Sequence, residues 1–246
     1  MVLAKKIFAK IFAFFVVSKI KKSYANAAQI QINTLKRLIN KAEKTKFGIE
    51  HQFHKINSVE EYIDRVPIRD YEDIKKYIDE IKKGIKDILW PGKPKYLAKT
   101  SGTTSGVKHI PITNESMPNH ILCSRNALLF YIYETGDTSF LNGKTIFLQG
   151  SPVLDEINGI LIGRLSGIVA HHIPSYLRKN NLPSVKTNSI EDWEEKVNEI
   201  CKETINENMT TIGGIPSWVQ MYFETLLKKS KKKNIVQNIL VLEISK

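Results

Sequence analysis

Cysteine is scarce in this sequence of 246 residues. There are two cysteines, Cys123 and Cys201, and they are too far apart in the chain to form a Cys-x-x-Cys pair. A disulfide framework needs a set of paired cysteines, and a structural zinc site needs closely spaced ligands. We therefore expect neither feature, and we expect the protein to work in a reducing compartment, the cytoplasm.

Long hydrophobic runs are also missing from the N-terminal part. Lys10 interrupts the apolar stretch there and leaves only residues 11–17 unbroken, whereas a bilayer-spanning helix needs about 20 apolar residues. Ala25-Asn26-Ala27 resembles the cleavage site of a signal peptide, but the apolar stretch is short for one. The spacing favours an amphipathic first helix, which either packs on the domain or lies on a membrane surface.

Acidic residues are almost absent from the same region. Residues 1–46 contain eleven Lys or Arg and one acid, Glu43, and residues 228–233 add five lysines. Because the whole chain has a net charge of +12, the remainder is net negative and does not indicate a nucleic-acid-binding domain. Two interpretations stay open for the basic N-terminus: solvated helix faces, or contact with an acidic surface such as a membrane, a partner or RNA. No specific nucleic-acid partner is predicted, since aromatic residues do not alternate with the lysines.

The pattern of apolar residues changes near residue 95. Helical spacing recurs in residues 24–46, 58–63 and 71–81, and a region rich in Gly and Pro then ends the helical part. Beyond it, strands are expected at residues 96–99, 109–113, 144–148, 160–162, 169–173, 210–212 and 239–244. Helices are expected between them, at residues 114–134, 189–205 and 216–229, with Asn114 and Ser189 as N-caps and Gly213-Gly214 ending a strand. This predicts a helical segment, residues 1–95, followed by an α/β core, residues 96–246, with a sheet sandwiched by helices.

The segment from Thr100 to Lys108, TSGTTSGVK, carries the clearest chemical pattern. Gly102 and Gly106 permit positive φ and close backbone approach, so successive N–H groups can form an anion-binding nest. Five neutral hydroxyl groups offer further donors to phosphate oxygens: Thr100, Ser101, Thr103, Thr104 and Ser105. Lys108 adds one positive charge at the end of the segment. We therefore predict a polyphosphate-binding loop between two strands.

Several other motifs are absent. Three residues separate Gly102 from Gly106 and His109 follows Lys108, so the segment is not a Walker A motif, and the spacing of a dinucleotide fingerprint is missing as well. His171 and His172 are adjacent, but no third ligand follows at a suitable spacing. No metal site formed by side chains is predicted.

Leu97 to Lys108, LAKTSGTTSGVK, resembles the AMP-binding signature of the adenylate-forming superfamily. Flanking blocks narrow the resemblance: TKFG at 45–48, VP-x-x-D-Y at 66–71, WPG-K-x-K-Y at 90–96, IPIT at 110–113 and G-I-P-S-W at 214–218. Together they are similar to the plant auxin-responsive acyl acid–amido synthetase family, and most of all to its bacterial members. The resemblance extends from about Tyr24 to the C-terminus.

The resemblance implies an ATP-dependent ligase whose large domain has the α/β fold of adenylate-forming enzymes. Such enzymes use ATP and Mg²⁺ to activate a carboxylic acid as an acyl-adenylate, and they then join it to an amino acid or amine. Residues 100–106 would hold the phosphates, and Lys108 is the expected catalytic contact. An acyl pocket is expected around Gly150, Ser151, Gly213 and Gly214, although turn chemistry explains these four residues equally well.

The family's second and third nucleotide motifs and its C-terminal lid domain are not found within residues 1–246. We therefore expect the N-terminal half of an enzyme, incomplete for adenylation alone, from a truncated gene, a frameshift or a partial sequence. Two alternatives remain. An acyl-CoA synthetase would use CoA as the acceptor, and a non-catalytic module would use its basic N-terminal helices at a membrane or on RNA.

Overall fold

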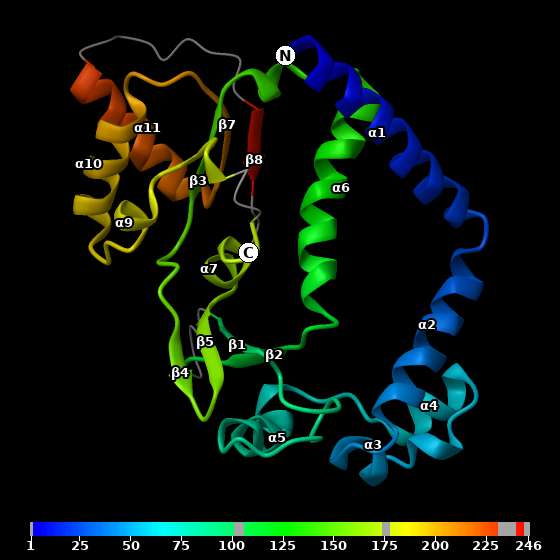
Figure 1. Ribbon diagram of the computed structural model, residues 1–246. Coiled ribbons are helices and arrows are strands. Elements are labelled where there is room, and N and C mark those ends of the chain that lie inside the picture. Colours follow the sequence, from blue (N-terminus) through cyan, green and yellow to red (C-terminus); the bar gives the residue numbers. More distant parts are fainter. Residues whose placement is uncertain (1, 101–105, 174–177, 231–239, 244–246) are drawn as a thin grey trace. The chain divides into compact units, whose positions relative to one another are not determined.

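The computed structural model describes residues 2–100, 106–173, 178–230 and 240–243 (Figure 1). The chain forms two compact units. Unit 1 comprises Met1–Phe15, Ser124–Val153 and Ser166–Lys246, and unit 2 comprises Val16–Cys123 and Leu154–Leu165. Two long helices, α1 (Val2–Tyr24) and α6 (Met117–Thr135), contribute residues to both units. In this division residues 96–123 lie in the same unit as residues 16–95, and the predicted boundary at residue 95 stays a prediction.

The helical elements of unit 2 are α2 (Ala27–Ala42), α3 (Lys46–Glu50), η1 (Phe53–Lys55), α4 (Val59–Arg65) and α5 (Tyr71–Lys82). Three of them, α3, α4 and α5, begin at side-chain caps. Thr45, Ser58 and Asp70 each accept a hydrogen bond from the backbone N–H three residues later, which satisfies one of the free donors of the first turn. The cap at Thr45 starts a new helix, so the helix predicted for residues 24–46 is interrupted.

The sheet of unit 2 has the strand order β2-β1-β5-β4. Its strands are β1 (Tyr96–Lys99), β2 (His109–Ile112), β4 (Asp155–Ile157) and β5 (Ile160–Arg164). Strand β1 pairs antiparallel with β2 and parallel with β5, and β4 pairs antiparallel with β5. Buried residues of α5, including Tyr77 and Ile81, form one hydrophobic cluster with Leu97 and Ile162. Burial of these side chains fixes α5 against the strands that carry the predicted phosphate loop.

The sheet of unit 1 is parallel, in the order β6-β3-β7-β8. Its strands are β3 (Lys144–Leu148), β6 (Asn181–Leu182), β7 (Met209–Gly214) and β8 (Leu240–Glu243). The helical elements of this unit are η2 (Ser139–Asn142), α7 (Leu165–Ala170), α9 (Val185–Asn188), α10 (Trp193–Thr204) and α11 (Pro216–Ser230). Ile146, Ile200, Ile212 and Tyr222 are buried together, which packs α10 and α11 against the sheet. Parallel strands require such crossover helices.

The α/β prediction is confirmed, but the strand predictions miss β4 and β6 and place one strand where a helix forms. Residues 169–173 were expected to form a strand, but α7 covers the first two of them and a turn follows. A Cβ at Gly167 would lie 2.7 Å from the carbonyl oxygen of Ser151, so tertiary packing rather than local propensity selects the helix here. Strand β7 extends through Gly213 and Gly214, so it ends two residues later than predicted.

Two helix starts also differ from expectation. Asp192, not Ser189, caps α10: its Oδ1 accepts a hydrogen bond from the Glu195 N–H at 2.7 Å, and Ser189 instead ends α9. Helix α6 begins at Met117 rather than directly after Asn114, because Thr113 and Ser116 exchange hydrogen bonds between their side chains and backbone N–H groups. In both cases a second acceptor lies within a few residues of the predicted cap.

Glu203 on α10 holds the start of α9 through hydrogen bonds. It should therefore make the stability of the folded chain depend on pH. Its carboxylate accepts hydrogen bonds from the backbone N–H of Ser184, the Ser184 hydroxyl and the Thr187 hydroxyl. Burial raises the pKa of Glu203, but these hydrogen bonds outweigh burial and leave the pKa below its ordinary value of 4.5. Since the folded pKa is the lower one, the stabilisation is present above the unfolded pKa and is lost as pH falls through the folded pKa.

We therefore expect Glu203→Gln to flatten the decline in unfolding free energy between about pH 5 and pH 3. Urea unfolding at a series of pH values measures this decline. Glu199→Gln, on the same helix but in an exposed pair with Lys202, is the matched control and should keep the wild-type slope. Equal slopes for wild type and Glu203→Gln would show that these hydrogen bonds do not favour the ionised carboxylate.

Candidate functional site

The base of the predicted phosphate loop is a strand pair. Strands β1 and β2 are in register from Tyr96 opposite Ile112 to Lys99 opposite His109. The Thr100 N–H then donates a hydrogen bond to the Lys108 carbonyl at 3.0 Å, which closes the loop. Five of the predicted phosphate ligands lie outside the described residues: Ser101, Gly102, Thr103, Thr104 and Ser105. Of the predicted set, the structure therefore describes Thr100, Gly106 and Lys108, and it brings all three to the same hairpin.

Gly106 adopts the conformation that the sequence predicts. Its φ is +77°, in the left-handed region that disfavours residues with a Cβ. No atom lies within 4 Å of the position that a Cβ would occupy, so packing does not require glycine at this position. The requirement at Gly106 is therefore conformational.

Tyr71 holds the described end of the loop, and sequence reasoning did not identify it as a site residue. Its hydroxyl accepts a hydrogen bond from the His109 N–H at 2.9 Å. The Lys108 Nζ lies 5.4 Å from the centroid of the Tyr71 ring, which is a cation–π contact. Tyr71 is the first residue of α5, whose start is fixed by a capping box between Asp70 and Asp73. A helix N-terminus thus positions both the strand and the lysine that follow the loop.

Lys108 supplies the positive charge at this position. Burial lowers the pKa of the neighbouring His109, and the charges of Lys82 and Lys99 lower it further, so the imidazole is neutral at pH 7. The Lys99 Nζ is 2.6 Å from Asp155 Oδ2, and this ion pair offsets its charge. Among the residues that the structure describes, Lys108 forms no ion pair. No carboxylate of the described residues pairs with Lys108. Its charge is therefore available to an anion at the loop.

The four predicted pocket residues lie together at one edge of the unit 1 sheet. Leu148 pairs with Gly214 in parallel register, and Gly150 and Ser151 follow directly after β3. Ligands of parallel α/β sheets bind at this carboxyl edge. Packing nevertheless also accounts for Gly214, because a Cβ there would lie 2.8 Å from the Leu148 Cβ. The Ser151 hydroxyl accepts a hydrogen bond from the Val153 N–H, as a turn residue does.

Lys196 is a further residue at this edge that sequence reasoning missed. It is buried on α10, and its Nζ donates a hydrogen bond to the Gln149 carbonyl at 3.4 Å, just past the end of β3. The sequence contains the signal: Lys196 follows Trp193 by three residues and precedes Ile200 by four, so it falls on the apolar face of its helix. The buried Lys196 side chain therefore contacts the segment that leads into Gly150.

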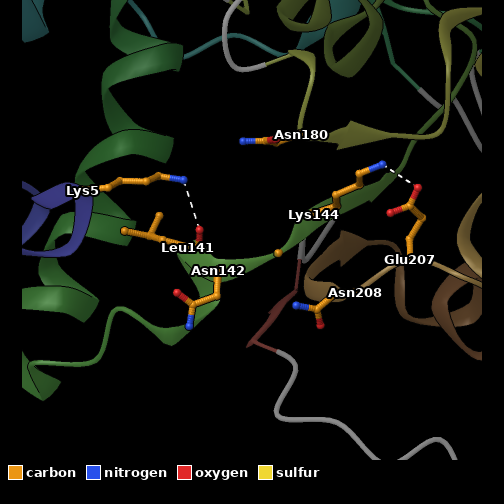
Figure 2. Close-up of a pocket in the computed structure, with 8 residues that line it drawn as sticks. Lys5, Leu141, Asn142, Lys144, Asn180, Glu207 and Asn208 are labelled. Carbon is orange, nitrogen blue, oxygen red and sulfur yellow. Dashed lines mark hydrogen bonds and ion pairs between the residues drawn. The ribbon is translucent and has the colours of Figure 1, made fainter. Parts of the chain in front are cut away.

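A pocket of about 440 Å³ lies at the opposite edge of the same sheet (Figure 2). Its lining residues precede or begin the strands β3, β6 and β7: Leu141, Asn142, Gly143, Lys144, Asn180, Glu207 and Asn208, together with Lys5 from α1. Figure 2 shows that both cations are already engaged, since the Lys144 Nζ pairs with Glu207 and the Lys5 Nζ donates to the Leu141 carbonyl. The pocket lies at the amino edge of a parallel sheet, one of its lysines is paired with a carboxylate and the other is hydrogen-bonded to a carbonyl, so we do not assign it as the substrate site.

The described part of the chain contains neither a metal-ligand cluster nor a bilayer-spanning helix. There, no three His, Cys, Asp or Glu side chains gather as metal ligands. Among the described helices, none combines the length and the hydropathy that a bilayer-spanning segment needs.

The fold has counterparts among solved structures. The structure "AtGH3.15 acyl acid amido synthetase in complex with 2,4-DB" matches with a TM-score of 0.70 at 19% identity, and "GH3.15 acyl acid amido synthetase" matches with a TM-score of 0.68 at 20% identity. Each match covers 86% of this chain and 38% of the other chain, so this chain spans well under half the length of those structures. No curated protein sequence matches the chain.

These likenesses define the fold as that of the N-terminal part of acyl acid amido synthetases. A family model, described as the GH3 family N-terminal domain, matches residues 16–184, which is more than half of the chain. The chain belongs to the GH3 family. The matched range contains both the predicted phosphate loop and the TKFG block, and it confirms the family predicted from those residues.

Proposed function

We propose that this chain is the phosphate-binding N-terminal part of an ATP-dependent ligase. The enzyme activates a carboxylic acid as an acyl-adenylate and joins it to an amino acid or amine. The observation that carries the proposal is the loop of residues 100–108, closed at its base by a strand pair and lying inside the GH3-matched range. The solved structures of similar fold are named acyl acid amido synthetases, which supports an amide product.

The residues present suit a magnesium-bound triphosphate. The loop combines hydroxyl groups, a glycine in the left-handed region at Gly106 and one cation at Lys108, which together provide donors and charge for phosphate oxygens. ATP with Mg²⁺ supplies the activated phosphate when bound. Residues 100–106 hold and orient the phosphates, and Lys108 offsets negative charge as pyrophosphate leaves. Such catalysis depends on positioning and electrostatics rather than on a side-chain nucleophile.

The acyl group binds, in this proposal, at the carboxyl edge of the unit 1 sheet, at Gly150, Ser151, Gly213 and Gly214. Their backbone groups follow adjacent parallel strands, where a small ligand is commonly bound. The remaining nucleotide contacts and the lid domain come from the part of the family fold that these 246 residues do not span. The two unpaired cysteines suit work in the cytoplasm.

Binding of magnesium pyrophosphate or ATP to the chain, measured by isothermal titration calorimetry, tests the loop assignment. Gly106→Ala should weaken binding by about tenfold or more, because a Cβ disfavours the φ of +77° that the nest needs. Gly92→Ala is the matched control: Gly92 also has a φ of +77° and open space around its Cβ position, and it lies outside the loop. Equal affinities for the two variants would contradict the assignment of the loop.

The reaction is tested in a protein that also carries the part of the family fold missing here. Pyrophosphate release from ATP should require a carboxylic acid, and an amide should form when an amino acid is added. Formation of a CoA thioester in place of an amide would assign the enzyme to the acyl-CoA synthetases. Absence of pyrophosphate release with every acid tested would contradict the ligase proposal.

A further inference from the structure

Helix α1 exposes an unusual set of large apolar side chains over its first four turns. Six of them are between 50% and 71% exposed: Leu3, Ile7, Phe8, Ile11, Phe14 and Phe15. Isolated exposed apolar residues are common on proteins, but a contiguous group of this kind marks an interaction surface. We call these six residues the α1 apolar face.

Helical geometry gathers these residues on one side of α1. Spacings of four and three residues place four of them in one row: Leu3, Ile7, Ile11 and Phe14. Phe8 directly follows Ile7, and Phe15 directly follows Phe14, so both lie next to this row. The opposite side of α1 packs against the protein, since Ala13 is completely buried. Helix α1 lies beside α6 (Figure 1), and Phe14, at the edge of the α1 apolar face, stacks on Tyr133 with 6.2 Å between the ring centroids. The helix is therefore apolar on both sides, whereas the sequence predicts lysines opposite a single apolar face.

The charge on α1 is of one sign. The helix contains six lysines and no acidic residue: Lys5, Lys6, Lys10, Lys19, Lys21 and Lys22. A second copy of the same helix would bring these like charges together, which disfavours self-association through this face. An anionic surface attracts them, and the long lysine side chains can reach headgroup phosphates while the aromatic and aliphatic groups enter the acyl boundary.

The α1 apolar face lies outside the sequence range that matches the family model. Residues 1–15 precede the range that matches the GH3 N-terminal domain, which begins at residue 16. The described helices include none suited to spanning a bilayer, so contact with lipid would be peripheral. We propose that residues 3–15 of α1 bind the surface of an anionic lipid bilayer, with the α1 apolar face inserted at the headgroup–acyl boundary. This inference does not depend on the proposed ligase activity.

Co-sedimentation of the 246-residue protein with vesicles tests the proposal. The protein should bind vesicles of phosphatidylcholine with phosphatidylglycerol, bind phosphatidylcholine alone at least about tenfold more weakly, and be released by salt. Phe8→Ser with Phe15→Ser should weaken binding to the anionic vesicles at least about tenfold, because it removes two inserted rings. Both side chains are 67% exposed, so the double variant should keep the wild-type melting temperature.

Two matched controls distinguish binding through the α1 apolar face from non-specific binding to vesicles. Ile68→Ser removes another fully exposed apolar side chain, outside α1, and should leave vesicle binding unchanged. Lys10→Glu with Lys19→Glu should weaken binding at least about tenfold, whereas Lys55→Glu with Lys86→Glu makes the same change in net charge and should have little effect.

Three results would overturn the proposal. The first is that the wild-type protein does not bind anionic vesicles. The second is that the Phe8 and Phe15 double variant binds them as well as the wild type does. The third is that the wild-type protein is a dimer that this double variant converts to a monomer without any change in lipid binding, because a second copy would then occupy the face.

Discussion

Replacing Gly48 by alanine should destabilise the folded chain by about 3 kcal/mol. A Cβ at Gly48 would lie 2.1 Å from the carbonyl oxygen of Ala42 and 2.9 Å from that of Glu43. Both neighbours are backbone atoms, so no side-chain rotation relieves the contact. The end of α2 or the start of α3 would have to move, which would disturb the buried cluster of Ile39 and Phe53.

The local structure explains why the approach is so close. The Thr45 hydroxyl donates to the Ala42 carbonyl at 2.7 Å and accepts from the Gly48 N–H at 3.0 Å. One buried side chain thus joins the last turn of α2 to the first turn of α3 and draws Gly48 against the backbone. The TKFG block, which served as a family marker in the sequence, therefore has a physical basis: the threonine makes the cap, and the glycine leaves room for it.

Urea unfolding followed by circular dichroism measures the loss. Gly92→Ala is again the control, since it introduces a Cβ at a positive φ but into open space, and it should cost only about 1–2 kcal/mol. An unchanged unfolding midpoint for Gly48→Ala would show that the two helices can separate at little cost, and that the tight turn does not stabilise the domain.

The main elements of the fold follow from short-range patterns in the sequence. Strand β3 and helix α11 were predicted because their apolar residues have the period of the element and turn residues border them. The strand predicted for residues 169–173 failed for a long-range reason. Val169 and Ile173 are β-branched and favour a strand locally, but α7 continues through Ala170 and packs Gly167 against the backbone at Ser151.

The candidate site also combines features that short-range patterns predict with contacts that such patterns do not predict. Glycine, hydroxyl and lysine residues at fixed spacing are local, so the loop of residues 100–108 could be predicted as a phosphate site. Tyr71 could not, because it meets His109 across 38 residues of sequence and through the packing of α5 on the sheet. The buried position of Lys196 was readable from its helical spacing, but its contact with Gln149 depends on how α10 docks.

Reversing the charge at Lys108 should weaken phosphate binding more than Gly106→Ala does. Lys108→Glu is expected to weaken binding of magnesium pyrophosphate roughly a hundredfold, since it removes a charged donor and adds a like charge beside the anion. The neutral His109 and the paired Lys99 cannot replace the lost charge. The variant should still fold, because Lys108 is only partly buried and the loop base is closed by its backbone carbonyl.

Lys95→Glu is the matched control for this change. The Lys95 Nζ also lies over a tyrosine ring, 5.3 Å from the centroid of Tyr96, so both variants lose one cation–π contact and two units of charge. Isothermal titration of both proteins separates a specific phosphate contact from the general effect of net charge. A similar loss for the two variants would mean that the loop attracts phosphate only through the overall positive charge of the chain. A hundredfold loss for Lys108→Glu alone would identify this lysine as the one that meets the phosphates.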